Sequence, residues 1–360
     1  MKRSEVRIGM VSWAHIHAQF RARALSEIPG AVVVAVSDDN RPRGEKAATE
    51  FGAEFVTDWR DLVSRPDIDV VMVHSENSRH PDQVIEAARA GKHVFCEKPV
   101  ATDVQDAEKM VAAIEQAGVD GTAAFVSRFS KEASRASEVM RSGAIGDVLF
   151  TRSFIGLEGL EEIGLPDDMV AWMADPELGG GGAWIDEGSH AVDLLRWLVD
   201  DIAEVGVVTA NRAKPRLGVE DVAVASVRFA NGALGEVVAT WSLNADIGMR
   251  NHVEIYGSEG TLVMRATDPR PAVEVFRSRD DELWRGWTEP FIRPAQVEPH
   301  DYTSWPPHLH HYKREVASYI SRYLDDERPY GPPLRDGLEC LKVISAGYSS
   351  SQRSGALVRV

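Results

Sequence analysis

The first 126 residues alternate short apolar runs with helical patterns, and no other feature of the sequence constrains the fold as strongly. The apolar runs are rich in β-branched residues and have the length of strands. We predict strands at 6–11, 31–37, 55–56, 68–74, 92–96 and 119–126, and helices at 15–27, 43–51, 58–64, 81–90 and 103–117. Continuous apolar strands that alternate with helices are typical of a parallel sheet covered on both faces. The expected fold is therefore α/β, beginning with a doubly wound parallel sheet.

The pattern changes after residue 126. We predict a helix at 128–141, strands at 147–155, 205–210, 223–229, 233–243, 251–256, 261–265 and 273–277, a long loop at 158–178, and helices at 308–324 and 334–350. Asn231-Gly232 between two alternating strands is a hairpin signal, so the second sheet should be open and largely antiparallel, in an α+β domain. Because 360 residues are long for one core, we divide the chain into domains 1–126 and 127–360.

Composition limits the partners that we expect. The chain carries 40 Lys and Arg residues against 56 Asp and Glu residues, a formal charge of −16, without a basic run. This argues against nucleic acid or an anionic membrane as the partner. Only Cys96 and Cys340 occur, so we expect no disulfide framework and a cytoplasmic location. The N-terminus has no apolar signal segment, and no apolar run reaches membrane-spanning length.

Polar residues follow the predicted parallel strands where each strand ends. Ligands of such sheets bind at the carboxyl ends of the strands. We expect the cofactor-binding residues there: Ser12, Trp13, Ala14 and His15 after the first strand, Asp38 after the second, Ser75, Asn77 and His80 after the fourth, and Glu97 and Lys98 after the fifth. Asp38 has the position of an acidic residue that binds the adenosine ribose. Its alternative role is that of a helix cap or turn residue.

A glycine-rich turn and a helical pattern at 179–198 stand out in the second half (GGGGAWIDEGSHAVDLLRWL). The helix is apolar nearly all round, which is typical of a buried helix. Asp186, His190 and Asp193 nevertheless lie on one stripe of one face, because their spacing is i, i+4 and i+7. Such groups are costly to bury unless each has a partner or faces a polar cavity. We interpret them as a catalytic stripe; the alternative is a satisfied core histidine with a capping aspartate.

These segments together resemble the Gfo/Idh/MocA family, the relatives of glucose-fructose oxidoreductase and inositol dehydrogenase. The two specific signatures are AGKHVFCEKP at 90–99 and the stretch at 179–198. Weaker matches are Asn77 and His80, the residues 124–129 that resemble the family's linker, Gly257 to Thr261, and Asp336 to Leu338. The resemblance covers nearly the whole chain. It implies a Rossmann domain followed by an open mixed sheet, whose outer face commonly makes dimer or tetramer contacts.

The resemblance also implies roles for individual residues. Lys98 would lie beside the nicotinamide and the substrate hydroxyl, His190 would be the general acid/base, and Asp186 would bind and polarise the substrate. We add Arg128, at the start of the second domain, to the substrate-binding residues Lys98, Asp186 and His190. NAD is the expected cofactor, and NADP is disfavoured because Asp38 and its neighbour would repel a 2′-phosphate. We assign no metal.

One departure from the family concerns the dinucleotide fingerprint GxGxxG/A. Ser12, Ala14 and His17 occupy its three glycine or alanine positions. Glycine there lets the pyrophosphate approach the backbone closely. We expect the amide donors at the start of the following helix to stay available, so that NAD(H) still binds, but more weakly than the full fingerprint allows.

The leading hypothesis is an NAD-dependent dehydrogenase of a secondary hydroxyl on a sugar, cyclitol or related polyol, assembled as a homodimer or homotetramer. The alternatives are an NAD-bound enzyme that cleaves glycosides through transient oxidation, and a non-catalytic sugar or dinucleotide sensor. Two further clusters have two interpretations each. Trp284, Trp287 and Trp305 stack on a sugar or pack in a core. His308, His310 and His311 form a zinc site or a helix-start cluster.

Overall fold

A computed structural model describes residues 4–243, 250–266, 272–277, 310–325 and 331–360 of the chain. The chain forms two compact units. The first unit comprises Met1–Val126, Leu165–Gly180 and Leu309–Leu341, and the second comprises Ser127–Gly164, Gly181–His308 and Lys342–Val360. Two later segments therefore join the first unit, in addition to the residues before 127. The division at residue 126 stays a prediction about autonomous domains.

The first unit is built on a six-stranded parallel sheet with the order β3-β2-β1-β4-β5-β6. Its strands are β1 (Val6–Val11), β2 (Ala31–Ser37), β3 (Glu54–Val56), β4 (Val70–Val73), β5 (His93–Cys96) and β6 (Gly121–Ala123). All four residues of β4 are buried, as expected of a strand covered on both faces. The strand order reverses beside β1, which brings the ends of β1, β2, β4 and β5 to one edge. The predicted doubly wound parallel sheet is confirmed.

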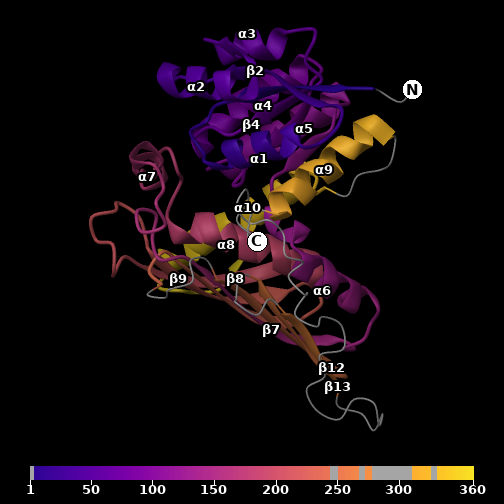
Figure 1. The fold of residues 1–360 in the computed structure, drawn as a ribbon. Helices are drawn as coiled ribbons and strands as arrows, with labels where there is room; N and C mark the ends of the chain where they lie inside the picture. Colours follow the sequence, from indigo (N-terminus) through magenta and orange to yellow (C-terminus); the bar gives the residue numbers. More distant parts are fainter. Residues whose placement is uncertain (1–3, 244–249, 267–271, 278–309, 326–330) are drawn as a thin grey trace. The chain divides into compact units, whose positions relative to one another are not determined.

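Helices cover this sheet in two layers (Figure 1). They are α1 (His17–Ser26), α2 (Arg41–Phe51), α3 (Trp59–Ser64), α4 (His80–Arg89), α5 (Val104–Ala117) and α9 (His310–Asp325). Helix α7 (Asp167–Met173) belongs to the same unit and contacts the turn after β1. Right-handed crossovers place α1 and α2 on one face and α3, α4 and α5 on the other. Side chains of Asn40, Asp58 and Asp103 cap three of these helices, and left-handed Gly52 and Gly118 end two of them.

The second unit contains an eight-stranded sheet with the order β13-β12-β11-β7-β10-β9-β8-β14. Its strands are β7 (Val148–Gly156), β8 (Ile202–Ala210), β9 (Val222–Phe229), β10 (Leu234–Thr240), β11 (Arg250–Gly257), β12 (Gly260–Ala266), β13 (Ala272–Arg277) and β14 (Val358–Arg359). Only the β7–β10 pair is parallel among these described pairings, so the sheet is mixed and mostly antiparallel, as predicted.

Helices α6 (Lys131–Arg141) and α8 (Ala183–Leu198) lie against one face of this sheet (Figure 1). Strand β9 shows the consequence, because its buried and exposed residues alternate along the strand. The exposed positions of the unit include several large apolar side chains: Leu149, Phe150, Val208, Val224, Leu234 and Leu357. Of these, Phe150, Val208, Val224 and Leu234 share one face by their register, so the sheet presents apolar groups on the side away from α8.

Several predicted boundaries differ from the structure. The predicted loop 158–178 contains α7, whose apolar residues Met169, Val170, Trp172 and Met173 are buried. The first helix begins at His17, two residues later than predicted, because residues 12–16 form a tight turn. The final helix, α10, spans Leu334–Ser351. The three clustered tryptophans and His308 lie outside the described residues. None of the described helices has both the length and the apolar character needed to cross a bilayer.

Candidate active site

The turn after β1 takes a conformation that usually requires glycine. Ser12 has φ +69°, in the left-handed region that serine adopts rarely. Its side chain is buried, and its hydroxyl accepts a hydrogen bond from the Ala14 amide at 3.1 Å. Its own amide donates to Ser37 O at 2.7 Å, which ties the turn to the end of β2. The serine thus reproduces the glycine geometry with a side-chain hydrogen bond that glycine cannot make.

The amides of this turn are all engaged. The Trp13 amide donates to Asp38 Oδ2 at 2.7 Å, and the Ala14 amide donates to Ser12 Oγ at 3.1 Å. The His15 amide donates to His74 O at 3.0 Å, and the Ile16 amide donates to Met169 Sδ at 3.4 Å. The His17 amide donates to His15 Nδ1 at 3.2 Å. The expectation that the amides stay available is therefore wrong. Local side chains cap the start of α1, so a pyrophosphate must replace some of these acceptors.

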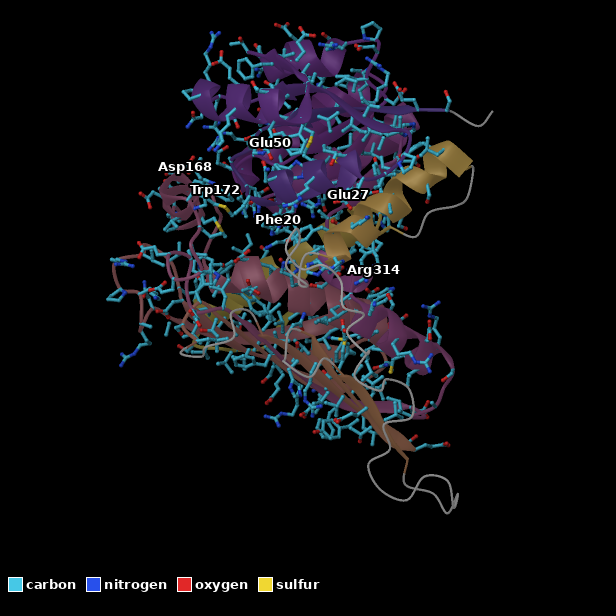
Figure 2. All side chains as sticks on the ribbon, in the orientation of Figure 1. Phe20, Glu27, Glu50, Asp168, Trp172 and Arg314 are labelled. Atoms are coloured by element: carbon cyan, nitrogen blue, oxygen red, sulfur yellow. The ribbon has the colours of Figure 1, made fainter. Side chains whose placement is uncertain are left out.

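Helix α7, which the sequence did not predict, packs against the turn after β1. Trp172 Nε1 donates to Ala14 O at 3.2 Å, and its ring lies 5.9 Å from that of His15. Asp168 forms an ion pair with Arg43 of α2. Figure 2 shows Asp168 and Trp172 projecting from this helix. The signal available in the sequence was the apolar spacing of Met169, Trp172 and their neighbours after Pro166 and Asp167, which is typical of a short helix.

Asp38 is buried at the end of β2, where the ribose-binding acid was predicted. Its carboxylate accepts hydrogen bonds from the amides of Trp13 and Asn40, both at 2.7 Å. It also accepts two bonds from Arg43, from Nε and Nη2, both at 2.9 Å. The adjacent Asp39 pairs with Arg79. The acid is therefore held rigidly, and a ribose would share it with Arg43.

The three residues predicted after β4, namely Ser75, Asn77 and His80, have different hydrogen-bond partners. Ser75 Oγ donates to Gln83 Oε1 at 2.6 Å. His80 is buried, and its ring nitrogens lie 3.1 Å from Pro99 O and 3.0 Å from Ser75 O, so it joins the segments after β4 and β5. Asn77 Nδ2 donates to Gly179 O at 2.9 Å, whereas its buried Oδ1 has no hydrogen-bond partner. That acceptor suits a hydroxyl or amide donor of a dinucleotide, so the edge fits NAD.

A buried charge network lies behind Lys98. Glu97 is fully buried; its Oε1 accepts from the Lys98 amide at 2.9 Å, and its Oε2 pairs with Arg21 and lies 3.1 Å from His17 Nδ1. Burial raises the pKa of Glu97, but Arg21, His17 and His15 together outweigh burial and hold it well below its ordinary value. The predicted pair Glu97 and Lys98 is therefore built into the end of β5.

Arg21 extends this network to α9. Its Nε donates to Glu315 Oε2 at 3.0 Å, and its guanidinium lies over the rings of Phe95 and Tyr312 at 5.0 and 5.2 Å. Burial raises the pKa of Glu315 to about 7, although Arg21 opposes the shift. The sequence prediction missed Arg21, His17 and Glu315 as partners, since no local pattern links residues so far apart.

The side chains of His15, His17 and Glu97 bring potential ligand atoms within 4.8 Å of one another. We nevertheless assign no metal here. Glu97 is already paired with the cationic Arg21, and Lys98 adds a second positive charge close by. A divalent cation would have to displace or tolerate both charges. The cluster is better described as an imidazole pair beside a satisfied carboxylate.

Helix α8 carries the second group of predicted residues. Its start requires glycine, since a Cβ on Gly182 would lie 2.0 Å from the carbonyl oxygen of Glu220. The Glu220 side chain accepts from the amides of Gly182 and Trp184 at 3.1 and 3.0 Å, which satisfies the first turn. Tyr348 donates to the same carboxylate oxygen at 2.8 Å. Glu220 is a positioning residue that the sequence reading did not identify.

The polar stripe of α8 is buried, and each member has a partner. Asp186 Oδ2 accepts from Trp241 Nε1 at 2.9 Å, and His190 Nδ1 lies 3.3 Å from Ser127 Oγ. Asp193 accepts two hydrogen bonds from Arg128, at 2.9 and 2.5 Å, and is fully buried. The structure thus places Asp186, His190 and Asp193 on one face of α8 and brings Arg128 against Asp193. It also gives Arg128 a structural role as the counter-ion of Asp193.

Comparisons with known proteins match both units. Residues 6–125 match the GFO/IDH/MocA model, described as an oxidoreductase family with an NAD-binding Rossmann fold, and residues 133–263 match the GFO/IDH/MocA C-terminal domain. A 1,5-anhydro-D-fructose reductase of Ensifer adhaerens is 33% identical, over 66% of this chain and 69% of its own length. An inositol 2-dehydrogenase of Acidothermus cellulolyticus is 32% identical, over 73% of this chain and 74% of its own.

A solved structure of levoglucosan dehydrogenase in complex with NADH and levoglucosan shares the fold. Its TM-score is 0.86 with 23% sequence identity, and the match covers 99% of each chain. At this identity the likeness bears on the fold rather than on the substrate. The two proteins share the same architecture over nearly the whole chain.

Glu315→Gln tests the buried network through the pH dependence of stability. Since the folded pKa of Glu315 is about 7, above the unfolded value, the group's contribution to stability is present at low pH and is lost as pH rises towards 7. The neutral variant keeps an acceptor for Arg21 and removes this loss. The difference in free energy of unfolding between the variant and the wild type should change by about 2 to 3 kcal/mol in favour of the variant as pH rises from about 5 to about 8.

Urea denaturation across this pH range measures the difference. The matched control is Glu27→Gln, which removes an exposed carboxylate that pairs with Lys313 between the same two helices, α1 and α9. Its pH profile should parallel that of the wild type. A parallel profile for Glu315→Gln as well would show that the Glu315 carboxyl titrates normally in the folded protein.

Proposed function

This chain belongs to the Gfo/Idh/MocA oxidoreductase family, and from that premise we propose that it is a dehydrogenase that uses NAD on a secondary hydroxyl of a sugar, cyclitol or related polyol. The observation that carries the proposal is the buried stripe of α8, where Asp186 and His190 share one face and each contacts a neutral hydrogen-bonding side chain. Groups of this kind are expensive to bury, and an acid beside a histidine suits a reaction that moves a proton.

The proposed division of labour follows from the chemistry of each group. NAD, when bound, supplies the hydride acceptor or donor. His190 takes the hydroxyl proton during oxidation and returns it during reduction, since imidazole titrates near neutrality. Asp186, held by Trp241, accepts a hydrogen bond from the substrate, and the Lys98 ammonium stabilises the developing alkoxide. Arg128 acts on the substrate through the position of Asp193 and α8.

The substrate class is proposed from two kinds of support. The relatives are named for 1,5-anhydro-D-fructose and inositol, which are polyhydroxylated rings. The described residues of the α8 stripe are hydrogen-bonding groups that suit several hydroxyls rather than an apolar ligand. We therefore propose a ring bearing adjacent hydroxyls, such as a pyranose, an anhydro sugar or a cyclitol.

The hydrogen bonds within the turn after β1 favour a second candidate function, a non-catalytic sensor of sugar or dinucleotide. All five amides of residues 13–17 are engaged, which weakens the case for routine cofactor turnover. The presence of Lys98, Asp186 and His190 argues for the dehydrogenase. The two candidates differ in whether any substrate changes the absorbance of the cofactor.

Removal of Lys98 or His190 tests the dehydrogenase directly. A panel of sugars, anhydro sugars, inositols and sugar acids is first screened by the absorbance of NADH. With the best substrate, Lys98→Ala and His190→Ala should each lower kcat by roughly a hundredfold or more, and the double variant should lose much less than the product of the two. Both losses arise because the groups serve one proton transfer.

Two residues away from the α8 stripe and from β5 provide matched controls for these variants. Lys109→Ala and His252→Ala remove the same side-chain types at positions where neither is buried, and both should keep wild-type kcat. Near-normal activity of His190→Ala on the best substrate would refute its role as acid/base. Absence of any NADH change across the whole panel would favour the sensor.

Cofactor choice gives a separate prediction. A 2′-phosphate near Asp38 would meet Asp38, Asp39 and Asp168, and the nearby Arg43 is already shared among all three of these carboxylates. We predict that NADH binds more tightly than NADPH, because like charges repel. Competitive fluorescence titration measures the ratio, and Asp38→Ser should shift it towards NADPH. Tighter binding of NADPH by the wild type would refute the prediction.

Assembly is predicted from the outer face of the second sheet. Val208 and Val224 are 59% and 52% exposed, and they lie opposite each other on the paired strands β8 and β9 of that sheet. Burial of such a face against a second copy is the simplest way to remove it from water. We predict a homodimer or homotetramer at micromolar concentration, which light scattering measures. Val224→Glu should dissociate it, whereas Val32→Glu on β2 should not; a monomeric wild type would contradict the prediction.

A further inference from the structure

We propose that binding of the cofactor pyrophosphate is coupled to protonation of His15, which caps α1 when neutral and donates to phosphate when charged. This rests on the proposed use of NAD at the edge formed by the ends of β1, β2, β4 and β5. It goes further, because it gives His15 two states and predicts how cofactor affinity depends on pH. The two states follow from the position of the imidazole at the start of α1.

The capping state is the one in the structure. His15 Nδ1 lies 3.2 Å from the amide of His17, the first residue of α1, and an acceptor at this position must be unprotonated. Ile16, which precedes the helix, makes no side-chain cap, and the first turn of α1 contains no acidic residue. The imidazole therefore supplies the acceptor that a phosphate oxygen supplies at other dinucleotide-binding turns.

Phosphate and the neutral imidazole compete for the same amide. A phosphate oxygen that accepts from the His17 amide leaves Nδ1 facing an anion, with no proton to donate. Uptake of one proton from solvent converts Nδ1 into a donor, so that the imidazolium contacts phosphate beside the amide that it formerly capped. The step makes one N–H bond and breaks none in the protein. A histidine thereby replaces part of what the glycine fingerprint provides.

Burial and the charged groups around His15 set its protonation state in the protein without cofactor. Burial lowers the pKa of His15 well below its ordinary value, and the neighbouring His17 adds to this effect. Lys98 and Arg21 lower it further, whereas Glu97 raises it; these groups lie on α1 and after β5. His74 contributes its carbonyl oxygen, which accepts from the His15 amide, and α7 contributes the indole of Trp172. His15 is therefore neutral in the free protein near pH 7.

The sign of the pH dependence follows from this. An anionic pyrophosphate beside the ring raises the pKa of His15 in the complex. Between the free and the bound pKa values, each binding event takes up a proton, so affinity falls as pH rises by at most about tenfold per pH unit. Adenosine has no phosphate and should show no such slope.

Isothermal titration calorimetry with ADP-ribose and with adenosine tests the proposal between about pH 6 and pH 9. ADP-ribose carries the pyrophosphate without the nicotinamide, and buffers of different ionisation heat report the protons taken up. The wild type should bind ADP-ribose more tightly at low pH with proton uptake. His15→Gln keeps an acceptor for the His17 amide but cannot be charged, so it should bind without proton uptake and with a flat profile.

Two further variants separate His15 from its neighbours. His17→Gln should keep the slope, and so should His93→Gln, because His93 begins β5 at the strand end away from this edge. An unchanged slope in His15→Gln, a slope lost only in His17→Gln, or an equal slope with adenosine would each overturn the proposal while NAD binding stands. Failure of both ADP-ribose and NADH to bind at millimolar concentration would overturn the proposed function together with the inference.

Discussion

The buried carboxylate of Glu97 is the interaction on which the functional edge of the first unit depends. It is inaccessible to solvent, and an ionised carboxylate at that depth costs several kcal/mol unless it is paired. Arg21 supplies the counter-charge, His17 supplies a ring nitrogen, and the amide of Lys98 supplies a backbone donor. One carboxylate thereby fixes the start of α1, the end of β5 and the backbone of the lysine that we assign to catalysis.

The second unit applies the same principle to a helix. Asp193 and Arg128 form a buried ion pair that fixes the end of the α8 stripe, while the neutral side chains of Trp241 and Ser127 form hydrogen bonds with its other members. The Glu220 carboxylate accepts from the amides at the start of the helix, where glycine leaves room for the Glu220 backbone. Both groups of site residues are therefore held by hydrogen bonds without a ligand, and such positioning reduces the cost of orienting a substrate.

Much of this could be predicted from the sequence, because the determining signals are local. The apolar runs that begin at Val6 and Ala31 predicted the parallel sheet, and their ends located Asp38. The i, i+4 spacing of Asp186 and His190 placed them on one face. Contacts between distant residues carried no such signal: Arg21 and Glu315 are 294 positions apart, and Trp172 and Ala14 are 158 apart. The availability of the turn amides was predicted wrongly, since it depends on the rotamers of Ser12 and His15 rather than on residue type.

The central claim is that a turn capped by its own side chains still admits a dinucleotide. The acceptors that a pyrophosphate must replace are a hydroxyl, a thioether and a neutral imidazole, all weaker than a phosphate oxygen. Fluorescence titration of the wild-type protein with NADH tests this most directly. We expect saturable binding with a dissociation constant of roughly 10 to 500 μM, or about 5 to 7 kcal/mol. Absence of binding at millimolar NADH would contradict it.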